Sequence, residues 1–118
     1  MVECSNHCIL ICATCKGPQE AKRIRSALLH YLPEGYILRA VDCMAGCDRP
    51  VTIGFQAAGK AQYLFGDIDT ATDVEALAQF AQQYQASDTG WTNSTERPKG
   101  LRSKTMARMP RLRLEDCA

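Results

Sequence analysis

The chain has 118 residues, which is enough for one domain and too few for two of ordinary size. Hydrophobic residues make up 46% and charged residues 23% of the chain, as is typical of a globular protein, and its apolar runs are too short for a membrane-spanning helix. The first seven residues contain no basic patch followed by an apolar stretch. We therefore expect no signal peptide, no membrane association and a cytoplasmic location.

The charge is spread unevenly along a chain whose formal net charge is +1. Residues 1–87 carry seven basic and nine acidic side chains, whereas residues 88–118 carry seven basic and four acidic ones. We divide the chain accordingly into a domain over 1–87 and a basic, partly irregular extension over 88–118. Its cations lie between Arg97 and Arg113 with no aromatic residue interleaved for base stacking, so we do not expect nucleic-acid binding.

The first part of the chain predicts a strand, a helix and a second strand. Residues 8–12 form a short, apolar, β-branched run that is typical of a buried strand, and residues 36–41 form another. Gly17 and Pro18 open the helix between them. Because a helix joins the two strands, we expect the strands to be parallel. The apolar face of this helix is predicted from helical spacing at Ala21, Ile24, Leu28 and Tyr31.

The next part predicts a hairpin and a second helix. Residues 51–55 and 61–65 are strands joined by a turn in which Gly59 can take a positive φ. Thr72 and Glu75 have the spacing of a capping box, which places the start of the helix there. The apolar face of this helix is predicted at Val74, Leu77, Ala78, Ala81 and Tyr84.

These elements predict a small α/β domain of thioredoxin-like order. It contains a βαβ unit, a β-hairpin and a C-terminal helix, and both helices can cover the sheet. From Trp91 onward the pattern is weak, and Pro98 and Pro110 interrupt it. We therefore expect an irregular basic C-terminal tail, held to the domain by Trp91.

Cysteine is the most unusual feature of the composition. Seven cysteines are present, and six of them lie within the first 47 residues. A secreted disulfide scaffold more often has an even number together with a secretion signal. In a reducing compartment, clustered thiols are typical of metal ligands or redox groups.

Two cysteine pairs are predicted in loops that follow strands: Cys12 with Cys15, and Cys43 with Cys47. Two intervening residues allow both sulfurs to reach one tetrahedral metal ion with bonds of about 2.3 Å. Three intervening residues that include Gly46 allow the same. Four thiolates fit a tetrahedral zinc ion or a [2Fe–2S] cluster.

The remaining cysteines have less defined roles. Cys8 falls on the first predicted strand, and we expect it to be a residue of the hydrophobic core. Cys4 and Cys8 are also candidates for additional metal ligands. Lys16 and Arg49 flank the two cysteine pairs, where cations would stabilise a negatively charged thiolate site. Cys117 belongs to no pattern.

Five motifs stand out over residues 8–110: Cys12-Ala-Thr-Cys15-Lys16, Cys43-Met-Ala-Gly-Cys47-Asp-Arg49-Pro50, Gln56-Ala-Ala-Gly59-Lys60, Tyr63-Leu-Phe65-Gly66-Asp67 and Glu96-Arg97-Pro98. Together they resemble the DUF1636 family of bacterial, predicted metal-binding proteins, which is similar to thioredoxin-like [2Fe–2S] ferredoxins. The resemblance implies that the metal ligands are Cys12, Cys15, Cys43 and Cys47.

The resemblance has two further implications. Thioredoxin-like folds keep a proline, often cis, just before a strand, and Pro50 occupies that place beside the predicted metal site; an ordinary trans proline at the start of an edge strand is the alternative. The ferredoxins also have a wider first cysteine pair, which Cys4 with Cys15 would restore.

Three functions stay open at this point. The first is a [2Fe–2S] electron carrier, which is not an enzyme and needs a redox partner protein that the sequence does not identify. The second is a structural zinc or metal-delivery protein with the same four ligands. The third is a thiol–disulfide oxidoreductase that uses Cys12 as the attacking thiolate and Cys15 as the resolving thiol. A homodimer that shares ligands through Cys4 and Cys8 is also open.

Overall fold

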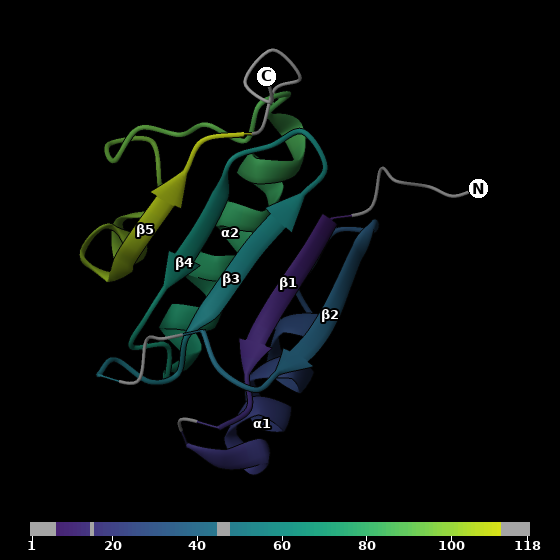
Figure 1. Ribbon diagram of the computed structural model, residues 1–118, viewed down its shortest axis with the longest axis vertical. Helices are drawn as coiled ribbons and strands as arrows, with labels where there is room; N and C mark the ends of the chain where they lie inside the picture. Colours follow the sequence, from purple (N-terminus) through teal and green to yellow (C-terminus); the bar gives the residue numbers. More distant parts are fainter. Residues whose placement is uncertain (1–6, 15, 45–47, 112–118) are drawn as a thin grey trace, which may run out of the picture.

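The computed structural model describes residues 7–14, 16–44 and 48–111. Figure 1 shows a sheet and its helices, which follow one another in the order β1 (His7–Cys12), α1 (Gly17–Leu29), β2 (Tyr36–Val41), β3 (Ile53–Ala57), β4 (Gln62–Phe65), α2 (Ala71–Ala86), the 3-10 helix η1 (Lys99–Lys104) and β5 (Thr105–Met109). The predicted α/β class is confirmed, and so are the βαβ unit, the hairpin and the helix that follows it.

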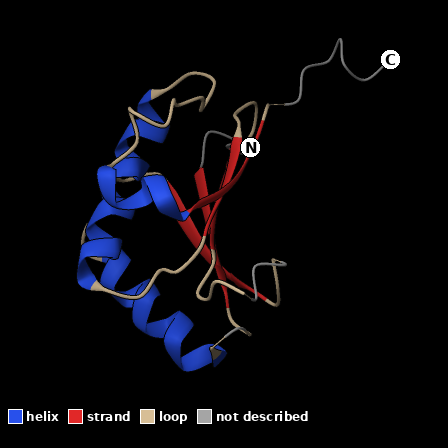
Figure 2. Cartoon of the chain, turned by 90° about the vertical axis from the view of Figure 1, so that its left-hand side faces the viewer, coloured by secondary structure: helices blue, strands red, loops and turns tan. Residues whose placement is uncertain are grey.

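The sheet has the strand order β2-β1-β3-β4-β5. β1 and β2 are parallel, as predicted for strands joined by a helix, and the other neighbouring strands are antiparallel. Figure 2 shows the helices on one side of the sheet. In the described part of the chain, the opposite face of the sheet carries no helix, and we call it the open face. None of the described helices is long and apolar enough to cross a lipid bilayer.

Helix α1 begins at Gly17, whose φ of 86° suits a residue without a Cβ, and Pro18 occupies its first turn. The helix packs on the sheet through Ala21, Ile24 and Leu28, as predicted. Tyr31 was predicted on the same face, but it is 52% exposed. The helix ends at Leu29, so helical spacing no longer places Tyr31 over the sheet.

Helix α2 begins earlier than the sequence pattern predicts. The capping box is formed by Thr70 and Asp73, not by Thr72 and Glu75. Thr70 Oγ1 accepts a hydrogen bond from the Asp73 N–H (3.2 Å), and Asp73 Oδ2 accepts one from the Thr70 N–H (3.0 Å). Both threonines are followed three residues later by an acidic side chain, but only Thr70 takes the extended conformation that a cap needs.

The core between α2 and the sheet is rich in aromatic side chains. Phe55 of β3 meets Phe80 of α2 edge to face, with 4.9 Å between the ring centres. Tyr84 is fully buried, and its hydroxyl donates to the carbonyl of Ala61 at 2.6 Å. Burial of a side chain of this size stabilises the fold by roughly 1.5–3 kcal/mol. The buried rings of Phe55, Phe80 and Tyr84 therefore hold α2 on the sheet.

The segment after α2 contains regular structure that the sequence analysis did not predict. The 3-10 helix η1 buries Leu101, and β5 pairs with β4 along the edge of the sheet. Tyr63 links this segment to β4, because its hydroxyl donates to Gly90 O (2.7 Å) and accepts from the Thr92 N–H (2.8 Å). Residues 90–109 are therefore tied to the sheet.

Candidate functional site

The candidate site lies where β1 and β2 end. Cys12 is the last residue of β1 and is paired in register with Val41, the last residue of β2. Cys43 follows Val41 by two residues. Because the strands are parallel, their carboxyl ends meet at the same edge of the sheet, and the loop that follows Cys12 starts beside the loop that carries Cys43.

The two loops are joined by hydrogen bonds. The Ala13 N–H donates to Val41 O at 2.8 Å. The Thr14 hydroxyl donates to Asp42 O, and the Cys12 thiol also donates to Asp42 O with 3.7 Å between sulfur and oxygen. The sulfur of Cys12 is therefore directed to the segment that leads into Cys43.

A third segment borders Cys12. The Cys12 N–H donates to Thr52 O at 3.1 Å, which places the residues just before β3 beside the end of β1. The cis peptide bond among the described residues joins Pro50 to Val51, so it follows Pro50, whereas the resemblance implied one before it. β3 lies between β1 and β4, so Pro50 does not introduce an edge strand.

Cys12 and Cys43 differ sharply in their access to solvent. Cys12 is 1% exposed and therefore buried, whereas Cys43 is exposed to solvent. Met44, the residue after Cys43, lines a shallow apolar recess on the open face, next to Gly54. A Cβ at Gly54 would lie 3.2 Å from the Met44 sulfur, so the absence of a side chain there lets Met44 pack closely. This contact anchors the second loop beside the sheet.

The structure places part of the predicted ligand set. It places Cys12 at the end of β1 and Cys43 just after the end of β2, at the same edge of the sheet, while Cys15, Cys47 and Cys4 lie outside the described residues. Within the described residues, no group of three or more His, Cys, Asp or Glu side chains is arranged to hold a metal ion. The four-cysteine centre therefore stays a prediction. Its donor set consists of thiols alone, which suits a soft metal or an iron–sulfur cluster.

Cys8 was expected in the core, but it is half-buried. It pairs with Ile37 and Gln56 near the start of β1, at the opposite end of the strand from Cys12. Partial burial raises the pKa of the Cys8 thiol, and the nearby Arg39 opposes this only in part. A thiol with a raised pKa is a poorer metal ligand, because metals bind the thiolate.

The two cations predicted beside the cysteines have different surroundings. Lys16 is exposed at the N-cap position of α1. The guanidinium of Arg49 forms an ion pair with Asp67 (Nε to Oδ2, 2.7 Å) and donates to Ser103 O at 2.8 Å. Arg49 thus connects the β2–β3 loop to the end of β4 and to η1, and its charge is balanced by Asp67.

Sequence reasoning missed a polar contact at the opposite end of β1. His7 is buried, and its Nε2 lies 2.8 Å from Lys60 Nζ. Lys60 also donates to the carbonyls of Tyr84 and Gln85 (2.7 and 3.2 Å), where it caps the C-terminus of α2. Burial lowers the pKa of Lys60, and the charge of Asp88 counteracts this. The sequence holds no local signal for this contact, because its members are far apart in the chain.

The family of the chain follows from comparison with known proteins. Residues 9–111 match the family described as "Protein of unknown function (DUF1636)", which covers most of the chain, so the chain belongs to this family. No curated protein and no solved structure matches the chain significantly.

Proposed function

We propose that this member of the DUF1636 family is a metal-binding electron carrier that holds a [2Fe–2S] cluster on Cys12, Cys15, Cys43 and Cys47. One observation carries the proposal. Two loops that each contain a cysteine pair in the sequence leave the sheet together, joined by the bond from the Ala13 N–H to Val41 O. Two such loops at one edge can supply the four thiolate ligands of a cluster.

The surroundings of the cysteines suit a negatively charged thiolate centre. α1 begins at Gly17, directly after the first loop, and the positive end of a helix dipole stabilises negative charge. Lys16 adds a positive charge at the same end of the helix. When bound, a [2Fe–2S] cluster supplies one-electron redox chemistry. Hydrogen bonds from the two loops would set its potential, and the exposed Cys43 would give a partner protein access.

The geometry is less suited to the thiol–disulfide oxidoreductase. An attacking thiolate must reach the disulfide of its substrate. Cys12, the first cysteine of the first pair, is 1% exposed, and its thiol donates to Asp42 O. Burial of this kind restricts access by a protein disulfide.

The proposal is tested by two cysteine variants of the full chain, purified under strict anaerobiosis and compared with the unaltered protein. Cys43→Ser removes a proposed ligand, whereas Cys8→Ser removes a thiol from the same sheet about 13 Å further back along β1. We expect Cys43→Ser to lose the visible absorbance and the acid-labile sulfide, and Cys8→Ser to keep both. Equal loss in both variants, or no loss in either, would refute the assigned ligand set.

A further inference from the structure

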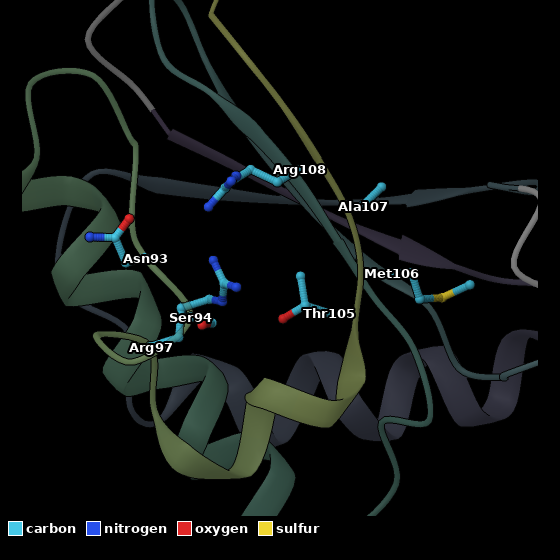
Figure 3. Close-up of a pocket in the computed structure, with 7 residues that line it drawn as sticks. All are labelled: Asn93, Ser94, Arg97, Thr105, Met106, Ala107 and Arg108. Atoms are coloured by element: carbon cyan, nitrogen blue, oxygen red, sulfur yellow. The ribbon is translucent and has the colours of Figure 1, made fainter.

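A second site lies at the opposite edge of the sheet, beside β5. A groove of about 530 Å³ separates β5 from the segment that follows α2. Figure 3 shows that the side chains of Arg97 and Arg108 extend into this groove from its two walls. The groove is lined by Asn93, Ser94, Arg97, Thr105, Met106, Ala107 and Arg108.

Arg97 is a buried cation without a carboxylate partner in the described part of the chain. Its residue is 7% exposed, and its Nη1 donates to Thr92 O and Thr92 Oγ1 at 3.0 and 3.2 Å. Its Nε is buried and has no acceptor among the described residues. A buried charge or donor left without a partner costs free energy. Guanidinium groups bind oxyanions through adjacent N–H donors, so a buried arginine with a donor that no described residue uses is a candidate for a ligand contact.

Arg108 holds a second positive charge close to the first. Its Nη1 donates to Thr92 O at 2.8 Å, so the two guanidinium groups share one carbonyl acceptor. The Cζ atom of Arg108 lies 3.6 Å from the centre of the Trp91 ring, and this contact fixes the position of the Arg108 guanidinium. Two like charges held together repel each other unless an anion lies between them. The guanidinium groups of Arg97 and Arg108 are therefore already held in position for an anion before it binds.

The other polar groups of the groove add hydrogen-bonding capacity without adding negative charge. Asn93 and Ser94 line it with an amide and a hydroxyl. Thr105 donates its hydroxyl proton to Leu101 O at 2.8 Å, which leaves its oxygen as an acceptor. Glu96, the acidic neighbour of Arg97 in the chain, accepts from the Asn93 N–H at 2.7 Å and is not among the lining residues.

We propose that this groove binds a small molecule through a phosphate group. Two guanidinium groups match the charge of a phosphate dianion, and the amide of Asn93 and the hydroxyl of Ser94 supply donors for its oxygens. The volume is in the range of small-molecule sites. A nucleic acid is a poorer fit, because no aromatic side chain is among the lining residues of the groove to stack on a base. The site lies three strands away from the cysteine loops, so it does not depend on the proposed electron carrier.

The test is a titration of the full chain with pyrophosphate and with inorganic phosphate at an ionic strength held constant with potassium chloride. Isothermal calorimetry gives the affinity. The fluorescence of Trp91, the single tryptophan of the chain, reports on Arg108 directly. We expect saturable binding with one site per chain. Arg97→Gln and Arg108→Gln should each weaken binding by about tenfold to a hundredfold.

Two further variants separate a built site from general charge attraction. Arg25→Gln removes an exposed cation from α1 and should leave the affinity unchanged. Ser94→Asp places a carboxylate in the groove and should abolish binding while raising the Tm by a few degrees, which keeps the test informative if Arg97→Gln fails to fold. Three results would overturn the proposal: no saturable binding of either anion, equal weakening by all the arginine variants, or binding of single-stranded oligonucleotides alone.

Discussion

The N–H of Ala13 donates to the carbonyl oxygen of Val41 at 2.8 Å, one residue beyond the last paired positions of β1 and β2. This bond extends the contact between the strands to the start of the loop that follows Cys12, next to the loop that carries Cys43. Two short cysteine motifs separated by 27 residues thereby start from the same point at the edge of the sheet. The proposed thiolate centre depends on this arrangement.

Substitution of Ala13 tests that dependence. Ala13→Pro removes the donor of the bond to Val41, and we expect the variant to lose about 1 kcal/mol of stability and much of its bound metal. The measurement is the metal content of the folded fraction, with the fold checked by circular dichroism. The matched control is Ala71→Pro at the first position of α2, where proline is tolerated and metal content should not change. Full metal content in Ala13→Pro would show that the bond is not needed.

The capping box of α2 gives a prediction about stability. Thr70→Ala should cost about 1 kcal/mol, because the Asp73 N–H loses its acceptor. Thr72→Ala changes an exposed residue within the helix and should change the free energy of unfolding by less than about 0.5 kcal/mol. Urea denaturation of both variants measures the difference. A larger loss of stability in Thr72→Ala than in Thr70→Ala would mean that Thr72 caps the helix, as the sequence pattern predicts.

The carboxylate of Asp73 makes stability depend on pH. Its burial raises the pKa, but hydrogen bonds from Thr70, Lys104 and Asp69 outweigh burial, so the pKa of Asp73 lies below its usual value of 3.8. A carboxyl group whose folded-state pKa is lowered stabilises the fold above its unfolded-state pKa and loses that contribution as the pH falls through the folded-state value. We expect Asp73→Asn to be less stable than the unaltered protein by about 1.5–3 kcal/mol at pH 7.

That difference should shrink as the pH falls from about 4 through the lower folded-state pKa, below which Asp73 is neutral in both states. The readout is the free energy of unfolding of both proteins between pH 2 and pH 7. A difference that stays constant over this range would mean that the charge of Asp73, including its ion pair with Lys104 (2.9 Å), contributes nothing.

The aromatic core predicts a large effect at Phe80. This side chain is fully buried and meets the rings of both Phe55 and Tyr63 at 4.9 Å between ring centres. Phe80→Ala should therefore cost about 3–5 kcal/mol, because it removes contacts and leaves a cavity. Gln79→Ala on the exposed side of α2 serves as the control and should be nearly neutral. Chemical denaturation of the two variants decides whether this cluster is the main support of the helix.

The first strands and both helices could be predicted because their signals are local. Residues 8–12 and 36–41 are apolar runs of strand length, and Ala21, Ile24 and Leu28 recur at helical spacing. Strand β5 was missed because its sequence, Thr-Met-Ala-Arg-Met, has a single β-branched residue and none of its five positions is fully buried. Its conformation is set by pairing with β4 across a long stretch of chain.

The cysteine site and the arginine groove also differ in how far the sequence predicts them. The cysteine pairs form short motifs, so the sequence alone predicts them, and their approach follows from the parallel strands. Arg97 and Arg108 are eleven residues apart within a cationic stretch that the sequence predicts to be an irregular tail. They meet only because both donate to Thr92 O, and no local pattern encodes a shared acceptor.

The central claim, a [2Fe–2S] centre on four cysteines, is tested most directly by counting iron, zinc and acid-labile sulfide per chain in anaerobically purified protein. The visible spectrum is recorded before and after dithionite. The account predicts about two irons and two sulfides per chain, with absorbance that bleaches on reduction. Zinc alone, or no metal, in a protein without visible absorbance would contradict the electron-carrier function.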